Sequence, residues 1–298
     1  MDNKNIMLTV FTPTYNRGYC LERLYQSLLK QKCKGFVWMI IDDGSTDNTK
    51  MLIKQFQNEG KISISYYYQK NAGKMMAHNK AVNLCWTELF MCLDSDDILV
   101  DNAIELILNK WENRAHLGNI CGIIAPKLMI DRNNKALPVF PLKNQTNTLG
   151  GIYSGGYKGE TALVFRTELI KRFPFPLEPG EKFIPEGLAY DKIDESYLYI
   201  VIPDPLMICA YQQDGYTQNI QKVYVANPRG SIKSFIHDLK ISTSKIKIIK
   251  LRTRIIAFGL IANMSIAQIF KLVDKPIVTL FLLPLGYLYK EKLLKSIR

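Results

Sequence analysis

Residues 89–97 read Leu-Phe-Met-Cys-Leu-Asp-Ser-Asp-Asp, so that five apolar residues pass directly into a segment with three carboxylates. A short continuous apolar run is typical of a strand that is buried on both faces, as in a parallel sheet. Two earlier stretches repeat the pattern, because the apolar runs 7–11 and 36–41 lead into the polar segments 12–18 and 42–47. Open α/β sheets bind ligands at the carboxyl ends of their strands. We therefore expect the three polar clusters to lie on one rim.

Helical periodicity fills the intervals between these strands. The clearest example is the i, i+3, i+4, i+7, i+8 stripe formed by Leu21, Leu24, Tyr25, Leu28 and Leu29. The alternation predicts an α/β domain over residues 1–227, more regular in 1–112 than in 113–227. Further expected elements are helices at 47–56, 75–86 and 101–111 and strands at 62–68, 120–125, 161–165, 197–202 and 206–211.

The acidic cluster after the strand at residues 89–93 consists of Asp94, Asp96 and Asp97. Like charges a few ångströms apart disfavour ionisation unless a cation is near. Mg²⁺ and Mn²⁺ prefer oxygen ligands that they share between carboxylates and substrate phosphates. The cluster therefore indicates a metal and diphosphate site. The alternative is a solvated cluster at a helix start, with Asp97 or Asp101 as the cap.

A second acidic pair, Asp42 and Asp43, follows the buried strand at residues 36–41. Neither a Gly-x-Gly-x-x-Gly loop nor a Gly-x-x-x-x-Gly-Lys-[Ser/Thr] phosphate loop occurs in the sequence. Carboxylates at a strand end can instead accept hydrogen bonds from a nucleotide base or from ribose hydroxyls. The alternative is ordinary turn chemistry, since Asp-Gly-Ser is a common turn sequence.

Four motifs occur in a fixed order along the first hundred residues: Thr-Pro-Thr-Tyr-Asn-Arg at 12–17, Ile-Asp-Asp-Gly-Ser-Thr-Asp-Asn-Thr at 41–49, Asn-Ala-Gly-Lys at 71–74 with Ala77-His78-Asn79, and Leu-Asp-Ser-Asp-Asp at 93–97. Together they resemble the donor-binding half of glycosyltransferase family 2, inverting enzymes with the GT-A fold, of the type that builds bacterial cell-surface glycans. The resemblance is strong over residues 6–112 and fainter to about 220. It implies a Rossmann-like, mostly parallel mixed sheet with helices on both faces, a nucleotide-sugar half at 1–112 and an acceptor half at 113–227.

The resemblance also implies roles for individual residues. Pro13 and Tyr15 match the loop that packs around the nucleotide base, and Asp42 and Asp43 match the pair that binds base and ribose. The segment that usually approaches the base and diphosphate contains Lys74, His78 and Asn79, with His78 where many members have Arg.

A divalent metal ion, Mg²⁺ or Mn²⁺, is the cofactor that the resemblance implies. Asp94 and Asp96, with Ser95 between them, match the Asp-x-Asp motif that meets the ribose and the metal, and Asp97 stands beside it. Many members supply a metal-binding His near the end of the domain, and Asp214 is the substitute that this chain offers there.

The catalytic base is expected on the segment Lys-Phe-Ile-Pro-Glu-Gly at residues 182–187, where family members carry an acidic residue, often in a Glu-Asp pair. Glu186 is the first candidate, with Gly187 in place of the second acid, and Asp191 is the second candidate. The alternative for Glu186 is a carboxylate at a helix start with no chemical role.

The net charge of +12 belongs almost entirely to residues 228–298, which hold 14 Lys or Arg and three acids, whereas 1–227 carries about +1. Apolar residues interleave with the basic ones. The apolar run 276–289, flanked by Lys275 and Lys290, is shorter than the roughly 20 residues of a transmembrane helix. We therefore expect a basic, amphipathic, mainly helical tail on an anionic membrane surface. A helical subdomain that packs on the body or on a second subunit, and nucleic-acid binding, are the alternatives.

The sequence as a whole predicts a transferase that moves one sugar from a nucleotide-sugar, most simply a UDP-sugar, to a lipid-linked or cell-surface glycan acceptor. Single addition is favoured because no Trp follows Trp111, so the Gln-x-x-Arg-Trp motif of processive synthases is absent. No signal peptide is visible and no Cys-x-x-Cys pair occurs, which favours a cytoplasmic location on the inner face of the cell membrane. The alternatives are a membrane-bound nucleotide-sugar binder without transfer activity and a sugar-phosphate nucleotidyltransferase. A homodimer is left open.

Overall fold

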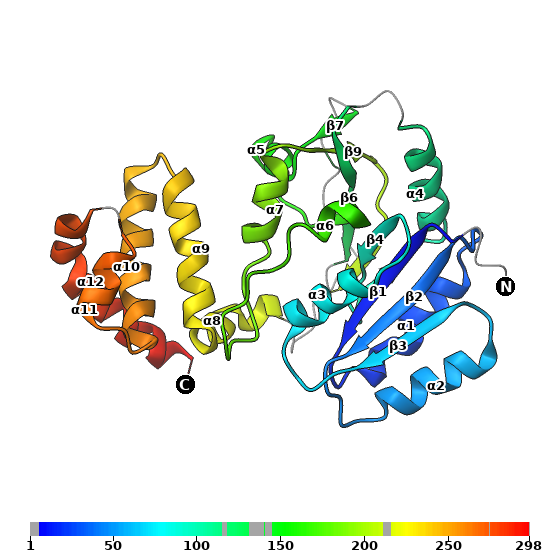
Figure 1. The fold of residues 1–298 in the computed structure, drawn as a ribbon, viewed down its shortest axis with the longest axis horizontal. Helices are drawn as coiled ribbons and strands as arrows, with labels where there is room; N and C mark the ends of the chain where they lie inside the picture. Colours follow the sequence, from blue (N-terminus) through cyan, green and yellow to red (C-terminus); the bar gives the residue numbers. More distant parts are fainter. Residues whose placement is uncertain are drawn as a thin grey trace. The chain divides into compact units, whose positions relative to one another are not determined.

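The computed structural model describes residues 6–114, 118–130, 140, 145–210, 216–273 and 275–297. The chain divides into two compact units. The first consists of residues 1–174 and 189–212, and the second of residues 175–188 and 213–298. Figure 1 follows the chain through both units. The predicted tail at 228–298 lies wholly within the second unit. This unit also contains residues 175–188 and 213–227.

Four parallel strands form the first half of the sheet in the first unit. They are β1 (Leu8–Thr14), β2 (Phe36–Asp42), β3 (Ile64–Tyr68) and β4 (Leu89–Cys92), side by side in the order β3-β2-β1-β4. The ends of β1 and β2 are aligned, since Thr14 pairs with Asp42. The polar segments after β1, β2 and β4 therefore emerge at one rim, which confirms the sequence-based prediction.

The sheet continues past β4 with mixed strand directions. The strand β8 (Thr161–Arg166) runs antiparallel to both β4 and β6 (Ile120–Ile130). The remaining strands are β5 (Ile98–Leu99), β7 (Thr146–Asn147), β9 (Leu198–Val201) and β10 (Met207–Ala210). β5 and β7 were not predicted, because two residues are too short to show periodicity.

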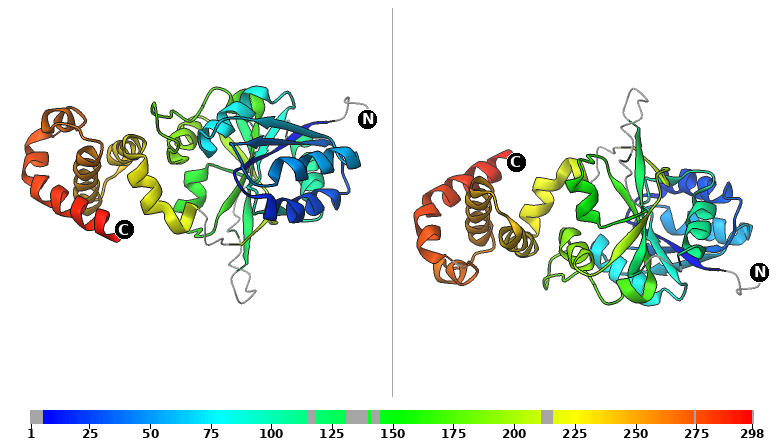
Figure 2. Two further views of the ribbon diagram at one scale, coloured as in Figure 1. Left: turned by 90° about the horizontal axis from the view of Figure 1, so that it is seen from below. Right: turned by 90° about the horizontal axis from the view of Figure 1, so that it is seen from above.

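Helices cover both faces of this sheet because successive strand residues point to opposite sides. α1 (Gly18–Leu29), α2 (Thr49–Glu59) and α4 (Ala103–Glu112) pack on the face that carries Leu8, Val10, Trp38 and Met91. α3 (Lys74–Leu84) covers the other face, where Phe11 and Phe90 contact His78. Figure 2 shows α3 on the opposite side of the sheet from α1 and α2. The predicted GT-A-type arrangement is confirmed.

Three short helices complete the unit or lead into it: α5 (Leu149–Ser154), α6 (Thr167–Ile170) and α7 (Gly187–Asp194).

The second unit is helical and has its own apolar core. Its helices are α8 (Tyr216–Ala226), α9 (Pro228–Ile241), α10 (Lys245–Ile261), α11 (Ile266–Lys271) and α12 (Pro276–Ser296). Phe235 of α9 and Phe258 of α10 meet edge to face, with ring centroids 5.2 Å apart. The expected mainly helical C-terminal part is thus confirmed. Among the helices of the described ranges, none is both long enough and apolar enough to cross a bilayer.

Candidate active site

The loops that follow β1 and β2 are tied together by hydrogen bonds. The Asn16 N–H donates to Ser45 Oγ at 2.9 Å, and Asn16 Oδ1 accepts from the Thr46 N–H at 2.7 Å. Asn16 has a φ of 52°, a conformation that Asn tolerates better than most residues. Beside this bonded pair of loops, Pro13 is half-buried and the Tyr15 ring is 50% exposed. The two predicted base-contacting residues therefore lie at the rim, with the Tyr15 ring open to solvent.

Asp42 lies at the end of β2 and is buried. Its Oδ1 accepts from the Ser45 N–H at 2.7 Å, and its Oδ2 accepts from the Tyr66 hydroxyl at 2.8 Å. Burial and the Asp42 carboxylate raise the pKa of Tyr66 above its ordinary value. Tyr66 therefore remains a hydrogen-bond donor to Asp42 at neutral pH.

Asp43 connects the second loop to a third, which follows β3. Its Oδ1 accepts from Gln69 Nε2 at 2.7 Å and from the Ala72 N–H at 2.8 Å, and its Oδ2 accepts from the Gly73 N–H at 2.8 Å. Gly73 adopts a φ of 92°, which a residue with a side chain rarely takes. Asp43 thus holds the loop that leads into α3, and three loops form one hydrogen-bonded wall at the rim.

Lys74, the first residue of α3, reaches the acidic segment after β4. Its Nζ lies 2.8 Å from Asp94 Oδ1 and 2.9 Å from Asp94 Oδ2. Burial acts against the charge of Asp94, but Lys74 and Lys127 bring the Asp94 pKa below its ordinary value. On the same helix, Asn79 is half-buried. The structure therefore brings Lys74 and Asp94 together as an ion pair.

His78 lies beneath the rim, in the core of the first unit. Its ring meets Phe11 and Phe90 edge to face, with centroid distances of 5.8 and 5.2 Å. Burial lowers the pKa of His78 to about 3, and the charge of Lys74 acts in the same direction. The imidazole is therefore neutral at physiological pH and adds no positive charge beneath the rim.

The segment Asp94 to Asp97 forms a turn, because the Asp97 N–H donates to the Asp94 carbonyl at 3.0 Å. Ser95 is buried in this turn, while the Asp96 side chain remains 21% exposed. Arg17 lies 3.9 Å from Asp96 Oδ2, and Arg23 donates to the Asp96 carbonyl. The turn thus presents Asp96 at the rim, where its carboxylate has a long contact with Arg17.

Asp97 is paired with Lys127 of β6, whose Nζ lies 3.1 Å from Asp97 Oδ2 and 3.6 Å from Glu160 Oε2. Burial opposes the charge of Lys127, but the carboxylates of Asp97, Asp94 and Glu160 raise its pKa. Lys74 and Lys127 therefore relieve part of the repulsion that predicted a metal ion. Sequence reasoning missed Lys127, since nothing local marks a residue that β6 brings from 30 positions away.

Asp96 is the carboxylate that best fits a divalent ion. Burial raises its pKa, and the charges of Asp94 and Asp97 raise it further. A cation beside Asp96 relieves this repulsion, and Mg²⁺ characteristically takes one or two protein carboxylates and completes its shell with phosphate and water. The described residues hold no preformed group of three or more His, Cys, Asp or Glu for a metal. Asp214 lies outside the described residues.

The two candidate bases lie around the start of α7. Glu186 is exposed, directly precedes this helix and belongs to the second unit. Asp191 is half-buried within the helix and belongs to the first unit. The Glu186 side chain is therefore accessible to solvent, as a base that receives a proton from a bound acceptor must be before binding.

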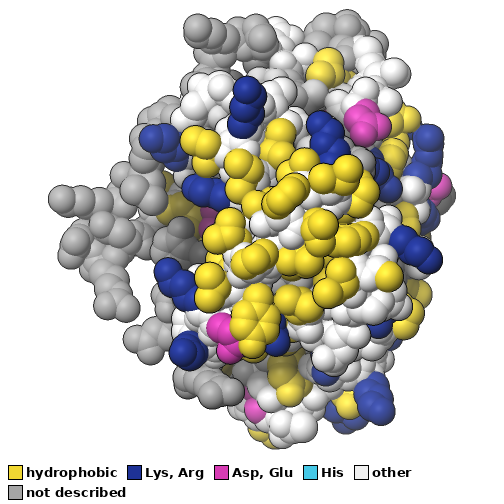
Figure 3. Space-filling view, turned by 90° about the vertical axis from the view of Figure 1, so that its left-hand side faces the viewer, with side chains coloured by type: hydrophobic (Ala, Val, Ile, Leu, Met, Phe, Trp, Pro, Cys, Tyr) yellow, Lys and Arg dark blue, Asp and Glu magenta, His cyan; other side chains and the backbone are white. Residues whose placement is uncertain are grey.

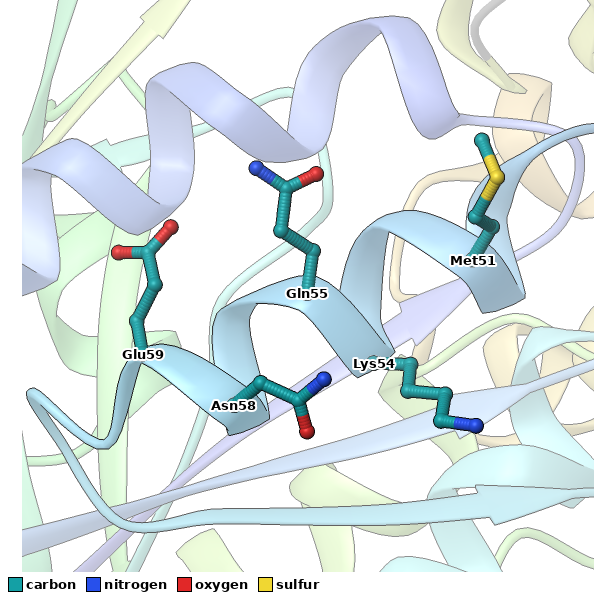
Figure 4. Close-up of a pocket in the computed structure, with 5 residues that line it drawn as sticks. All are labelled: Met51, Lys54, Gln55, Asn58 and Glu59. Atoms are coloured by element: carbon teal, nitrogen blue, oxygen red, sulfur yellow. The ribbon is translucent and has the colours of Figure 1, made fainter.

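A surface hollow with a volume of about 480 Å³ lies elsewhere, along α2. Figure 4 shows its lining side chains on one helix: Met51, Lys54, Gln55, Asn58 and Glu59. These residues are exposed and come from a single element. The hollow contains none of the motif residues, so we do not assign it to the site.

The buried His78 predicts a pH dependence of stability. The unfolded chain has an ordinary His pKa near 6.5, whereas the folded value is about 3. Between these pH values only the unfolded chain binds the proton, so the free energy of unfolding falls as the pH falls. We expect a loss of about 2 kcal/mol by pH ~5 from this residue alone. Urea unfolding at about pH 7.5 and pH 5 measures the loss, and His78→Leu should remove this part of it. Equal losses in both proteins would contradict the assignment.

Solved structures support the fold class. The chain is similar to Staphylococcus aureus TarS 1–349 in complex with UDP-GlcNAc, with a TM-score of 0.58, 16% identity, and 97% of this chain and 91% of that chain covered. A mannosyltransferase, PcManGT from Pyrobaculum calidifontis, in complex with GDP-Man and Mn²⁺, gives a TM-score of 0.52 at 16% identity, with 94% and 72% covered. At this identity the likeness shows the fold alone.

Residues 9–173 match the family model described as glycosyl transferase family 2. The chain belongs to glycosyl transferase family 2. An uncharacterized glycosyltransferase of Mycoplasma pneumoniae, the MG060 homolog, is 34% identical over 188 residues, 61% of this chain and 55% of the relative. The putative teichuronic acid biosynthesis glycosyltransferase TuaG of Bacillus subtilis is 32% identical over 115 residues, 39% of this chain and 46% of the relative. The chain thus spans about half the length of these relatives.

Proposed function

We propose that this chain is an inverting, divalent-metal-dependent glycosyltransferase that moves one sugar from a UDP-sugar to a lipid-linked or cell-surface glycan acceptor. The observation that carries the proposal is the turn after β4, which presents Asp96 beside three bonded loops and the Lys74 ammonium group. A UDP donor is supported by the TarS complex with UDP-GlcNAc, and a metal by the PcManGT complex with Mn²⁺.

In this proposal the three loops form the donor site. Pro13 and Tyr15 pack against the base, and the Asp42 and Asp43 region recognises base and ribose. The carboxylates of Asp42 and Asp43 already accept hydrogen bonds within the protein. We therefore propose that their main role is to hold the loops of the donor site in place. His78 and Asn79 lie on α3, and we propose that His78 positions this helix as a neutral core residue.

The proposed chemistry is a single displacement at the anomeric carbon. Glu186 removes the proton from the acceptor hydroxyl, and the acceptor oxygen attacks from the face opposite the nucleotide. The bond between the anomeric carbon and the diphosphate oxygen breaks, and its electron pair leaves with the nucleoside diphosphate. Attack from the opposite face inverts the anomeric configuration. Asp191 is the second candidate for the base.

Cationic groups around the turn after β4 offset the charge of the leaving group. A divalent ion held by Asp96, with Asp94 and Asp97 beside it, would act as a Lewis acid on the diphosphate. Lys74 already lies at this turn, 2.8 Å from Asp94 Oδ1. We propose that its ammonium group hydrogen-bonds a diphosphate oxygen when the donor is bound.

We place the reaction at the inner face of the cell membrane, with the enzyme attached peripherally. A glycan acceptor is supported by TuaG, which is named for teichuronic acid biosynthesis. The charge of residues 228–298 supports an anionic surface as a partner, because Lys and Arg near such a surface gain about 1 kcal/mol each.

Nucleotide binding provides a direct test of the donor site. We expect UDP with Mn²⁺ to raise the melting temperature more than UDP or Mn²⁺ alone, because a ligand at about 100 times its Kd stabilises the native state by about 2.7 kcal/mol. UMP, which lacks the second phosphate, is the matched control and should give a smaller shift. If UDP, GDP and dTDP all leave the melting temperature unchanged with Mn²⁺ present, the proposed donor site is wrong.

A further inference from the structure

One face of α12 is fixed against the core of the second unit. Thr279, Gly286 and Leu293 are buried and recur every seven residues, so they share one side of the helix. Arg252 of α10 donates to Thr279 Oγ1 at 3.2 Å. A Cβ atom on Gly286 would lie only 2.3 Å from Ile256 Cγ2, so α10 approaches α12 closely at this point. These contacts determine which side of α12 faces outward.

The outward side of α12 is apolar over its first three turns. Ile277, Phe281 and Leu288 are 71%, 78% and 63% exposed, and Leu280 and Leu285 are exposed beside them. We call these five residues the apolar face of α12. Figure 3 shows hydrophobic side chains gathered in one continuous patch on this end of the second unit. Contiguous exposed apolar patches mark interaction sites, whereas single exposed side chains do not.

Basic residues border this apolar face. Lys275 directly precedes α12. In the last two turns of the helix, the outward positions are occupied by Lys292 and Lys295 instead of apolar residues. Lys290 Nζ lies 5.6 Å from the centre of the Tyr287 ring. Figure 3 shows further Lys and Arg side chains around the patch. An apolar helix face bordered by cations complements the interface of an anionic lipid bilayer, where apolar acyl chains lie beneath negatively charged headgroups.

We propose that the apolar face of α12 inserts into an anionic lipid bilayer, with the helix lying in the plane of the interface and the bordering lysines at the headgroups. From Ile277 to Leu288 the helix rises about 17 Å, less than the roughly 30 Å of hydrocarbon that a spanning helix crosses. The inference deepens the membrane location proposed above and rests on it, because it names the surface that makes the contact.

Charge favours a bilayer over a second copy of the chain. A two-fold interface sets the same patch against itself. With antiparallel helices, Lys292 and Lys295 of one copy would face Lys275 of the other, and with parallel helices each lysine would face its equivalent. Like charges would meet in both arrangements, whereas phosphatidylglycerol supplies the opposite charge.

Flotation of the full chain with vesicles tests the inference. We expect it to float with phosphatidylcholine vesicles that contain phosphatidylglycerol, and much less with phosphatidylcholine alone. Phe281→Glu should lower the partition coefficient about tenfold, because it removes an aromatic side chain that would enter the bilayer and adds an anion. Lys292→Glu with Lys295→Glu should lower it by about tenfold and weaken its dependence on salt.

Matched controls come from α2 in the first unit. Met51 is 69% exposed and Lys54 is also exposed, so Met51→Glu and Lys54→Glu replace an exposed apolar and an exposed basic side chain by Glu away from the apolar face. Both should float like the unaltered chain. Phe281 is exposed, so Phe281→Glu should unfold at the same temperature as the unaltered chain, and circular dichroism checks this.

Three results would overturn the inference: no flotation with anionic vesicles at low salt, equal flotation of Phe281→Glu, or a dimer in light scattering that Phe281→Glu converts to monomers. The assay contains neither donor nor acceptor. A chain that transfers sugar without floating therefore contradicts only this inference, and one that floats without transferring sugar contradicts only the proposed enzymatic function.

Discussion

Asp96→Ala is expected to lower sugar transfer by about 1,000-fold or more, which corresponds to about 4 kcal/mol of lost transition-state stabilisation. Asp96 is a half-buried carboxylate of the turn after β4, and its neighbours Asp94 and Asp97 are already engaged by Lys74 and Lys127. Without Asp96 the site loses the oxygen ligand best placed for a divalent ion. Transfer of radiolabel from a nucleotide-sugar to the acceptor measures the effect.

The same variant should fold at least as well as the unaltered chain. Burial and two neighbouring carboxylates raise the pKa of Asp96, so its ionised form is disfavoured in the native state. We therefore expect an equal or higher melting temperature for Asp96→Ala. Asp101→Ala, at an exposed acid beyond the motif, is the matched control and should keep full activity. Full transfer activity in Asp96→Ala would remove Asp96 from the proposed mechanism.

Glu186→Gln is expected to lower the rate of transfer by about 10²- to 10⁴-fold, the usual contribution of a general base. The substitution keeps the size of the side chain and removes its ability to accept the acceptor proton. Donor binding should be unchanged, because Glu186 acts on the acceptor in this mechanism. The stabilisation by UDP and Mn²⁺ should therefore equal that of the unaltered chain while transfer is lost.

Asp191→Asn distinguishes the two candidate bases. If Glu186 is the base, Asp191→Asn should change the rate far less than Glu186→Gln does. The pH profile gives a second readout, since the limb that reports ionisation of the base should disappear only in the variant that lacks it. An active Glu186→Gln chain with an inactive Asp191→Asn chain would assign the base to Asp191 instead.

The rim of the sheet could be predicted from the sequence because its signals are local. Each apolar run ends where its polar motif begins, and β1, β2 and β4 are parallel neighbours. Lys127 could not be predicted, because only the pairing of β6 with β8 and β10 brings it to Asp97. Long-range pairing of this kind leaves no periodic pattern in the local sequence.

His78 shows a different limit. Its place in a motif indicates a role near the diphosphate, but the motif does not say which side of α3 it occupies. In the structure it points to Phe11 and Phe90. The second unit shows the same limit, because the sequence predicts apolar and basic residues but not that Thr279 and Gly286 face inward.

The most direct test of the central claim is the transfer of label from radiolabelled UDP-, GDP- and dTDP-sugars to lipid-linked acceptors in a bacterial membrane extract, with the purified full chain and Mn²⁺. We predict label in the organic phase and release of the nucleoside diphosphate with a UDP-sugar. Both should be lost on chelation of the metal and in Asp96→Ala. If no donor yields labelled product or free nucleoside diphosphate while the chain is folded, the proposed reaction is contradicted.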